Sequence, residues 1–186
     1  MCSAICEDIT LDSTSLPFFI TAAAVSSHEL SIANIRTSSV LSISYAFLIN
    51  EDIILRDLNG LDRASEEVNI FQVDDGYQQA VGDWLLTDTA KFPNGMKYIA
   101  DEIHKKGYKA GIWLAPFSAQ VSSKLANEHP DWLLRHNRNG KKMLGCQGWG
   151  GAYTIDIYNP EAREYIMKVF DVVLNEWGFD MVKLDF

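Results

Sequence analysis

Cysteine is scarce in this sequence and follows none of the spacings that mark a crosslinked or metal-bound domain. The 186 residues include three cysteines, Cys2, Cys6 and Cys146. An odd number leaves at least one thiol unpaired, and the separation of Cys2 from Cys6 is not the C-x-x-C spacing of zinc and redox sites. We therefore expect no disulfide framework, and we expect a reducing, cytoplasmic location.

Basic residues and long apolar runs are also in short supply. Sixteen lysines and arginines stand against 25 aspartates and glutamates, which gives a formal net charge of −9. Nucleic acids and anionic membranes both attract basic surfaces, so neither is expected as a partner. No apolar run approaches the roughly 18 residues that a membrane-spanning helix needs, and the N-terminus lacks the basic region of a signal peptide. Hydrophobic residues make up 47% of the chain, which is enough for one packed domain.

From residue 50 onward, the apolar pattern predicts strands and helices in alternation. Strands are predicted at 68–73, 108–114 and 181–186, and helices at 50–61, 95–106, 122–129 and 159–177. Strands and helices that alternate without hairpin turns indicate an α/β fold with parallel strands. An open nucleotide-binding sheet would carry a glycine-rich turn directly after its first strand, and that turn is missing. The pattern therefore favours the (β/α)8 TIM barrel.

The chain is short for that fold, and its first part does not fit the pattern. Eight βα units take about 250 residues, whereas this sequence has three clear strands and a possible fourth near 42–48. We therefore expect residues 45–186 to form the N-terminal half of a catalytic barrel. Residues 1–44, with weak strand patterns at 16–20 and 39–43, are expected to be an atypical segment of uncertain structure.

The last six residues give the strongest single indication of an active site. Alternation along a strand places Lys183 and Asp185 on one face, with Val182, Leu184 and Phe186 on the other. Burying either charge without a partner is costly, so the charged face is expected to open on a polar cavity. There the ammonium keeps the carboxylate ionised, and the carboxylate can act as a nucleophile. A structural ion pair and an exposed strand end are the alternatives.

Six motifs then occur in the order in which the microbial α-galactosidases carry them. They are FQVDDGY (71–77), GDW (82–84), KFPNG (91–95), GIWLAP (111–116), HPDW (129–132) and VKLDF (182–186). In these motifs the sequence resembles the melibiase and raffinase group of retaining glycoside hydrolases, to which plant raffinose synthases are related. The resemblance runs from about residue 50 to residue 186, and six ordered motifs are far more specific than any one of them.

The resemblance implies an activity and a role for each matching residue. Asp185 would be the nucleophile, and Lys183 beside it would contact a sugar hydroxyl. Asp74 and Asp75 would bind galactose hydroxyls, and Trp113 would form part of the sugar platform. Trp84 would help to shape the same pocket. The implied reaction is the hydrolysis of terminal α-galactosyl residues from oligosaccharides such as melibiose and raffinose, with no metal or other cofactor.

Two features of the family are missing from the sequence. Its acid/base is an aspartate on a later strand, beyond Phe186, and its N-terminal β-sandwich has no counterpart in residues 1–44. We therefore expect a fragment that does not turn over natural galactosides by itself, and we expect full-length relatives to be homo-oligomers. Galactosyl transfer, as in raffinose synthases, and an inactive galactoside-binding fragment are the alternatives. A metal-dependent hydrolase is not favoured, because no histidine falls at a predicted strand end.

The connection between Trp113 and Asp185 is unusually long. It measures 72 residues, against about 30 for an average βα unit of a barrel. Its glycine-rich stretch at 145–151 is expected to pass over the strand ends, where Gln147 and Trp149 can contact the sugar or its aglycone. A surface loop without a ligand is the alternative.

Overall fold

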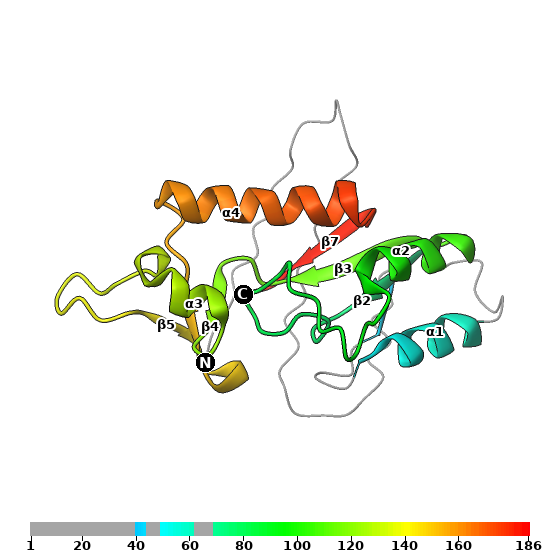
Figure 1. The fold of residues 1–186 in the computed structure, drawn as a ribbon, viewed down its shortest axis with the longest axis horizontal. Helices are drawn as coiled ribbons and strands as arrows, with labels where there is room; N and C mark the ends of the chain where they lie inside the picture. Colours follow the sequence, from blue (N-terminus) through cyan, green and yellow to red (C-terminus); the bar gives the residue numbers. More distant parts are fainter. Residues whose placement is uncertain (1–39, 44–48, 62–68) are drawn as a thin grey trace.

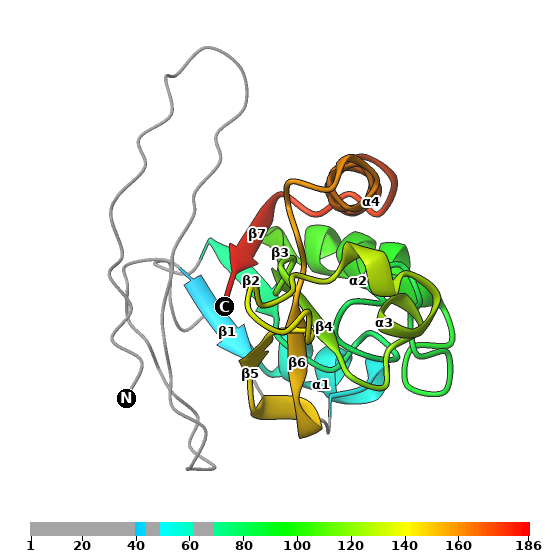
Figure 2. The same cartoon turned by 90° about the vertical axis from the view of Figure 1, so that its left-hand side faces the viewer.

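Residues 40–43, 49–61 and 69–186 are described by the computed structural model, and they are built around a parallel sheet (Figures 1 and 2). Its strands, in the hydrogen-bonded order β1-β2-β3-β7, are β1 (Val40–Ile43), β2 (Ile70–Val73), β3 (Lys109–Leu114) and β7 (Met181–Leu184). The predicted α/β architecture with parallel strands is thus confirmed. Among the described residues the sheet begins with β1, which agrees with the weak strand pattern predicted at 39–43 and lies before the expected start of the barrel at residue 45. The candidate strand at 16–20, and residues 44–48 of the candidate at 42–48, lie outside the described residues.

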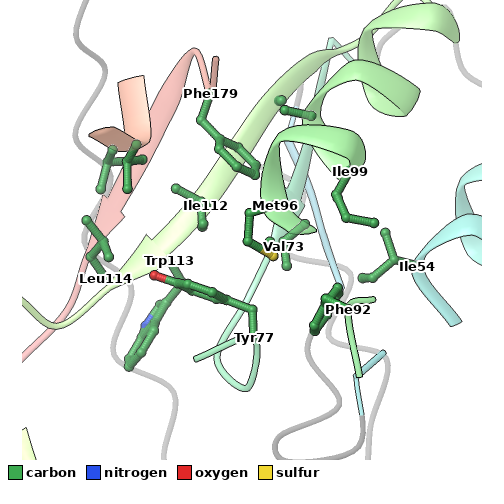
Figure 3. Packing of buried hydrophobic residues seen from close by; sticks show 14 of the residues in the cluster. Ile54, Val73, Tyr77, Phe92, Met96, Ile99, Ile112, Trp113, Leu114 and Phe179 are labelled. Atoms are coloured by element: carbon green, nitrogen blue, oxygen red, sulfur yellow. The ribbon is translucent and has the colours of Figure 1, made fainter. Parts of the chain in front are cut away.

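Strand register sorts the side chains of the sheet into two faces. One face is apolar and packs under the helices, and its aligned residues are Val73, Ile112 and Val182 (Figure 3). On the opposite face Gly111 lies between Gln72 and Met181 in the register. A Cβ on Gly111 would lie 2.8 Å from Cε of Met181 and 3.3 Å from Cβ of Gln72, so this glycine makes room for both neighbours. Two residues further along the strands, toward their carboxyl ends, this second face becomes polar.

Three helices cover the apolar face of the sheet, and all three begin where the sequence predicts. They are α1 (Glu51–Gly60), α2 (Gly95–Lys105) and α4 (Pro160–Asp171). Asn50 caps α1 and Asn159 caps α4, because each side chain accepts backbone amides of the first turn. The predicted buried stripe of α2 is confirmed, with Met96, Ile99, Ala100 and Ile103 at 0–1% exposure. Helix α4 continues as a π-helical turn over Val172–Glu176, which a 3.6-residue period does not predict.

Between β3 and α4 the chain forms a second, antiparallel sheet, which we call the excursion (residues 115–159). Its elements are β4 (Ser118–Gln120), α3 (Lys124–Glu128), β5 (Leu144–Cys146) and β6 (Ala152–Thr154), with the strand order β4-β6-β5. The excursion lies at the end toward which β3 and β7 point (Figure 1). Its position agrees with the prediction, but the sheet replaces the long loop predicted at 137–153. Strands of three residues are too short to reveal alternation.

The excursion is fastened to the loop that follows β2. Asp83 is buried, and its carboxylate oxygens accept the backbone amides of Lys124 at 2.8 Å and Leu125 at 2.9 Å. The hydroxyl of Tyr165 donates to the carbonyl of Gly82 at 2.6 Å. The contacts of Asp83 fix the excursion, and the contact of Tyr165 fixes α4, relative to the loop that follows β2. Within the described ranges, none of the helices is long and apolar enough to cross a membrane.

Candidate active site

The polar residues predicted from the strand ends come together at the carboxyl edge of the sheet. Val73 pairs with Ile112 in the register, so the next residues, Asp74 and Trp113, lie beside each other. Trp113 pairs in turn with Lys183 on β7. Residues aligned in neighbouring strands point to the same face of a sheet. Three strands therefore direct an aspartate, a tryptophan and a lysine toward one place.

Lys183 and Asp74 form an ion pair in this cluster. The distance from Nζ of Lys183 to Oδ2 of Asp74 is 3.0 Å, and the two side chains are 15% and 9% exposed. Oδ2 of Asp74 also accepts from Nε2 of Gln72 at 3.1 Å, while Oδ1 accepts from the backbone amide of Asp75 at 2.9 Å. The carboxylate of Asp74 is thus oriented through both oxygens. Gln72 was not predicted, although strand alternation places it on the same face as Asp74.

Asp185 follows β7 directly and is held in place by β3. Its backbone amide donates to the carbonyl of Leu114 at 3.0 Å, which extends the β3–β7 pairing by one residue. Oδ2 of Asp185 accepts from the indole N–H of Trp113 at 3.2 Å, and Oδ1 accepts from the amide of Phe186 at 3.1 Å. Two donors therefore orient a carboxylate that is still partly exposed. Donors on both oxygens thus fix the direction of the Asp185 carboxylate.

Asp75, the neighbour of Asp74 in the chain, has different hydrogen-bond partners. Its Oδ1 accepts from Nε2 of Gln78 at 2.6 Å, and its Oδ2 accepts from the indole N–H of Trp149 at 2.7 Å. Burial raises the pKa of Asp75, and the charge of Asp74 adds to the increase, while the bonds from Gln78 and Trp149 oppose it. The role of Gln78 could not be predicted from the sequence, because Gln78 lies in an irregular loop where no helix or strand period predicts the direction of its side chain.

A row of aromatic rings lines one side of the carboxylates. The ring centroids of Trp84 and Trp113 are 5.7 Å apart, those of Trp113 and Trp149 are 6.0 Å apart, and those of Trp149 and Phe186 are 4.9 Å apart. Trp84 is fully buried and Trp113 is only 2% exposed. Trp113, which the resemblance predicts as part of the sugar platform, lies between Trp84 and Trp149. For Gln147, the other residue proposed for the excursion, no side-chain hydrogen bond to the described site residues is formed.

The sequence profile of the melibiase family matches residues 45–186, about three quarters of the chain. The chain belongs to the melibiase family. Among the curated relatives of this melibiase-family chain, the α-galactosidase of Escherichia coli is 35% identical over 127 residues, which cover 63% of the chain and 17% of the relative. The α-galactosidase Mel36A of Lactobacillus acidophilus is 30% identical over 125 residues, which cover 63% of the chain and 16% of the relative.

A solved structure of the family agrees with these relatives. TtGalA, the α-galactosidase of Thermus thermophilus in complex with p-nitrophenyl α-D-galactopyranoside, superposes with a TM-score of 0.71 at 37% identity. The match covers 80% of the melibiase-family chain and 30% of TtGalA. The predicted resemblance to α-galactosidases is confirmed, and the chain spans about one sixth of the length of the curated relatives it matches. In the part of the chain that the structure describes, no group of three histidine, cysteine, aspartate or glutamate side chains is placed to hold a metal ion.

Proposed function

We propose that the melibiase-family chain carries the nucleophile and the galactose-binding residues of a retaining α-galactosidase. The observation that carries the proposal is the placement of Asp185, whose carboxylate accepts from Trp113 at 3.2 Å beside the ion pair of Lys183 and Asp74. The parallel strands β2, β3 and β7, together with the match to 30% of TtGalA, support the assignment of residues 45–186 to the first half of a (β/α)8 barrel. Active sites of such barrels lie at the carboxyl ends of the strands.

The proposed reaction has two steps at the anomeric carbon. A carboxylate oxygen of Asp185 forms a bond to this carbon while the bond from the carbon to the leaving oxygen breaks. The electron pair of the broken bond stays on the leaving oxygen, which takes a proton from a second carboxyl group about 5–5.5 Å from the nucleophile. Water then attacks the same carbon, the second carboxylate accepts the proton of the water, and Asp185 is released.

Neither neighbouring aspartate suits the role of that second carboxyl group. The carboxylate of Asp74 is already engaged by the ammonium of Lys183 at 3.0 Å. Burial raises the pKa of Asp75, the direction that a proton donor needs, but N–H groups of Gln78 and Trp149 donate to both of its oxygens. We therefore assign both aspartates to binding of galactose hydroxyls, and the acid/base to a residue outside the described part of the chain.

The remaining site residues surround the place that the sugar would take. Lys183 has three N–H donors, so it can contact a sugar hydroxyl while it holds Asp74. The indole N–H of Trp113 orients the nucleophile, and Trp84 supports Trp113 from the core. Trp149 lies beside Asp75 and reaches the sugar or its aglycone from the excursion. An oligosaccharide with a terminal α-galactosyl residue is the proposed substrate, and the TtGalA complex with stachyose supports this class.

Covalent labelling tests the nucleophile without the second carboxyl group. In 5-fluoro-α-D-galactosyl fluoride the leaving fluoride needs no proton, and the ring fluorine slows hydrolysis of the ester that forms. We expect intact-protein mass spectrometry to detect one galactosyl adduct and peptide mapping to place it on Asp185. Asp185→Asn should abolish the adduct. Asp180→Asn is the matched control, because Asp180 precedes the same strand and is bound by His104 at 2.7 Å, away from the site.

Two comparisons complete this experiment. The glucosyl analogue, which differs at C4, should label much more slowly, because Asp74 and Asp75 are proposed to recognise the galactose hydroxyls. A chimera in which the aligned segment of this chain replaces its counterpart in TtGalA should hydrolyse p-nitrophenyl α-D-galactopyranoside and lose this activity with Asp185→Asn. An adduct on a carboxylate other than Asp185, or a chimera whose activity survives Asp185→Asn, would contradict the proposal.

A further inference from the structure

Trp149 adopts a backbone conformation that needs an explanation. Its φ of 56° and ψ of 24° fall in the left-handed region, where residues other than glycine, asparagine and aspartate are seldom found. In the described ranges, the one other residue besides glycine with a positive φ is Phe186, and its ring packs edge-on against Trp149. Unfavourable backbone conformations persist where surrounding contacts hold them, and they concentrate at ligand sites. The contacts of Trp149 are therefore the place to look for its role.

The side chain of Trp149 joins the excursion to the site. Its indole Nε1 donates to Oδ2 of Asp75 at 2.7 Å, the distance of a strong charge-assisted hydrogen bond. Its ring lies 6.0 Å from that of Trp113, which in turn donates to Asp185. One side chain thus contacts the partner of the proposed nucleophile and one of the two proposed sugar-binding carboxylates.

The acceptor positions of Asp75 indicate what the hydrogen bond does. An ionised carboxylate has about four lone-pair positions, two on each oxygen. Gln78 uses one position on Oδ1, Trp149 uses one on Oδ2, and the backbone amide of Gly76 also lies close enough to stabilise the charged form. The acceptor positions of a carboxylate lie in its plane, and donors on opposite oxygens prevent the group from rotating, so the plane in which Asp75 can accept further donors is fixed. A pair of sugar hydroxyls requires this arrangement of acceptors.

We propose that Trp149 is a positioning residue, which fixes the carboxylate of Asp75 in the orientation that accepts two hydroxyls of the sugar. This inference rests on the proposed function of the site. The indole N–H stays on Oδ2 when the sugar binds, so the sugar and the tryptophan share the carboxylate and do not compete for it. The excursion then contributes to recognition of the terminal sugar through Asp75, in addition to any contact with the aglycone.

Nuclear magnetic resonance on the 186-residue chain tests the hydrogen bond without any ligand. The indole N–H resonance of Trp149, assigned through its loss in Trp149→Phe, should move with the same midpoint pH as the carboxyl carbon of Asp75. Because the indole bond lowers the pKa of Asp75, Trp149→Phe should raise that midpoint. The matched control is Trp132→Phe, since the indole of Trp132 also donates to a carboxylate, Oε2 of Glu161 at 3.3 Å, but lies outside the site.

Several titratable groups near Asp75 are present in every variant and cannot produce the difference. They are Asp74, Lys183, Asp185, Tyr77 and Lys91, whose ammonium donates to the carbonyl of Gly76 at 3.2 Å. A Trp149 resonance that does not follow the titration of Asp75, or a midpoint that is equal in Trp149→Phe and Trp132→Phe, would overturn the inference.

Binding of p-nitrophenyl α-D-galactopyranoside, measured by calorimetry in an Asp185→Asn background, tests the consequence for the sugar. Loss of one charge-assisted hydrogen bond predicts about tenfold weaker binding in Trp149→Phe, and Trp132→Phe should stay within about twofold. Equal or tighter binding in Trp149→Phe would overturn the inference, because tighter binding means that the indole competes with the sugar. If Asp185→Asn binds no galactoside while the resonances still titrate together, the proposed function fails and the positioning of Asp75 stands.

Discussion

Replacement of Lys183 by methionine removes the charge that faces Asp74 and keeps a side chain of similar length. The Nζ–Oδ2 distance is 3.0 Å, and the two side chains are only 15% and 9% exposed. In the variant, Asp74 would keep the donors from Gln72 and from the amide of Asp75 but would lose the ammonium. A largely buried carboxylate would then face an apolar side chain, which disfavours its charged form.

The size of the effect follows from this burial. Removal of one partner of a buried ion pair costs about 3–5 kcal/mol, whereas an exposed pair contributes about 0–1 kcal/mol. Because Asp74 retains two hydrogen bonds, we expect the lower end, about 3 kcal/mol of unfolding free energy. With a urea dependence of about 1–3 kcal/mol per molar, the midpoint of unfolding should fall by about 1–3 M.

Urea unfolding at pH 7, followed by tryptophan fluorescence and circular dichroism, measures this change. The matched control is Lys97→Met, because Lys97 pairs with Asp101 at 2.9 Å but the side chains are 63% and 47% exposed. That substitution should cost less than about 1 kcal/mol. The double variant Lys183→Met with Asp74→Asn should recover most of the loss, since it removes both charges together. If Lys183→Met costs no more than Lys97→Met, burial does not strengthen the pair and the reasoning is wrong.

Two further predictions concern other carboxylates of the site and its support. Asp83→Ala leaves two backbone amides at the start of α3, one of them buried, without their acceptor, and it should lower the unfolding free energy by about 1–3 kcal/mol. Asp131→Ala, at an exposed position, should change it by less than about 0.5 kcal/mol in the same urea assay. Burial raises the pKa of Asp75 above its ordinary value of 3.8, so the native state binds the proton more tightly than the unfolded state, and the ionisation of Asp75 lowers stability as the pH rises above about 4. The stability of Asp75→Asn relative to the unsubstituted chain should therefore increase from pH 4 to pH 7, and a difference that does not vary with pH would contradict the assignment.

Local pattern was enough to predict the parallel sheet and its helices. The stripe of α2 repeats at helical spacing, and its members are buried together because a helix packed on a sheet hides one face. Asn159 followed by proline marks the start of α4 because the side chain satisfies amides that no preceding turn can reach. Lys183 and Asp185 were placed from alternation alone, since a strand leaves little choice of direction. Each of these predictions needed only residues a few positions apart.

The excursion could not be predicted in the same way, because its structure depends on distant residues. Helix α3 has five residues and is stabilised at its start by Asp83, 41 positions before Lys124. The strands β4, β5 and β6 have three residues each, and their order β4-β6-β5 brings together segments separated by a helix and a long turn. A helix or a sheet this short is marginal without tertiary support. Composition shows that such a segment contains many turns, but it does not show which of its strands pair with each other.

The bond between Trp149 and Asp75 joins residues 74 positions apart, and its formation depends on the path of the excursion. Gly150 and Gly151, with φ of 76° and 107°, turn the backbone after the tryptophan so that β6 can pair with β4 and β5. A run of glycines signals such turns in the sequence, but the direction of the Trp149 side chain is set by the register of the antiparallel sheet. Recognition of the sugar through Asp75 would then depend on the packing of a sheet that contributes none of the carboxylates of the site. A substitution that shifts the register of β6 should therefore weaken galactoside binding as much as one at Trp149 itself.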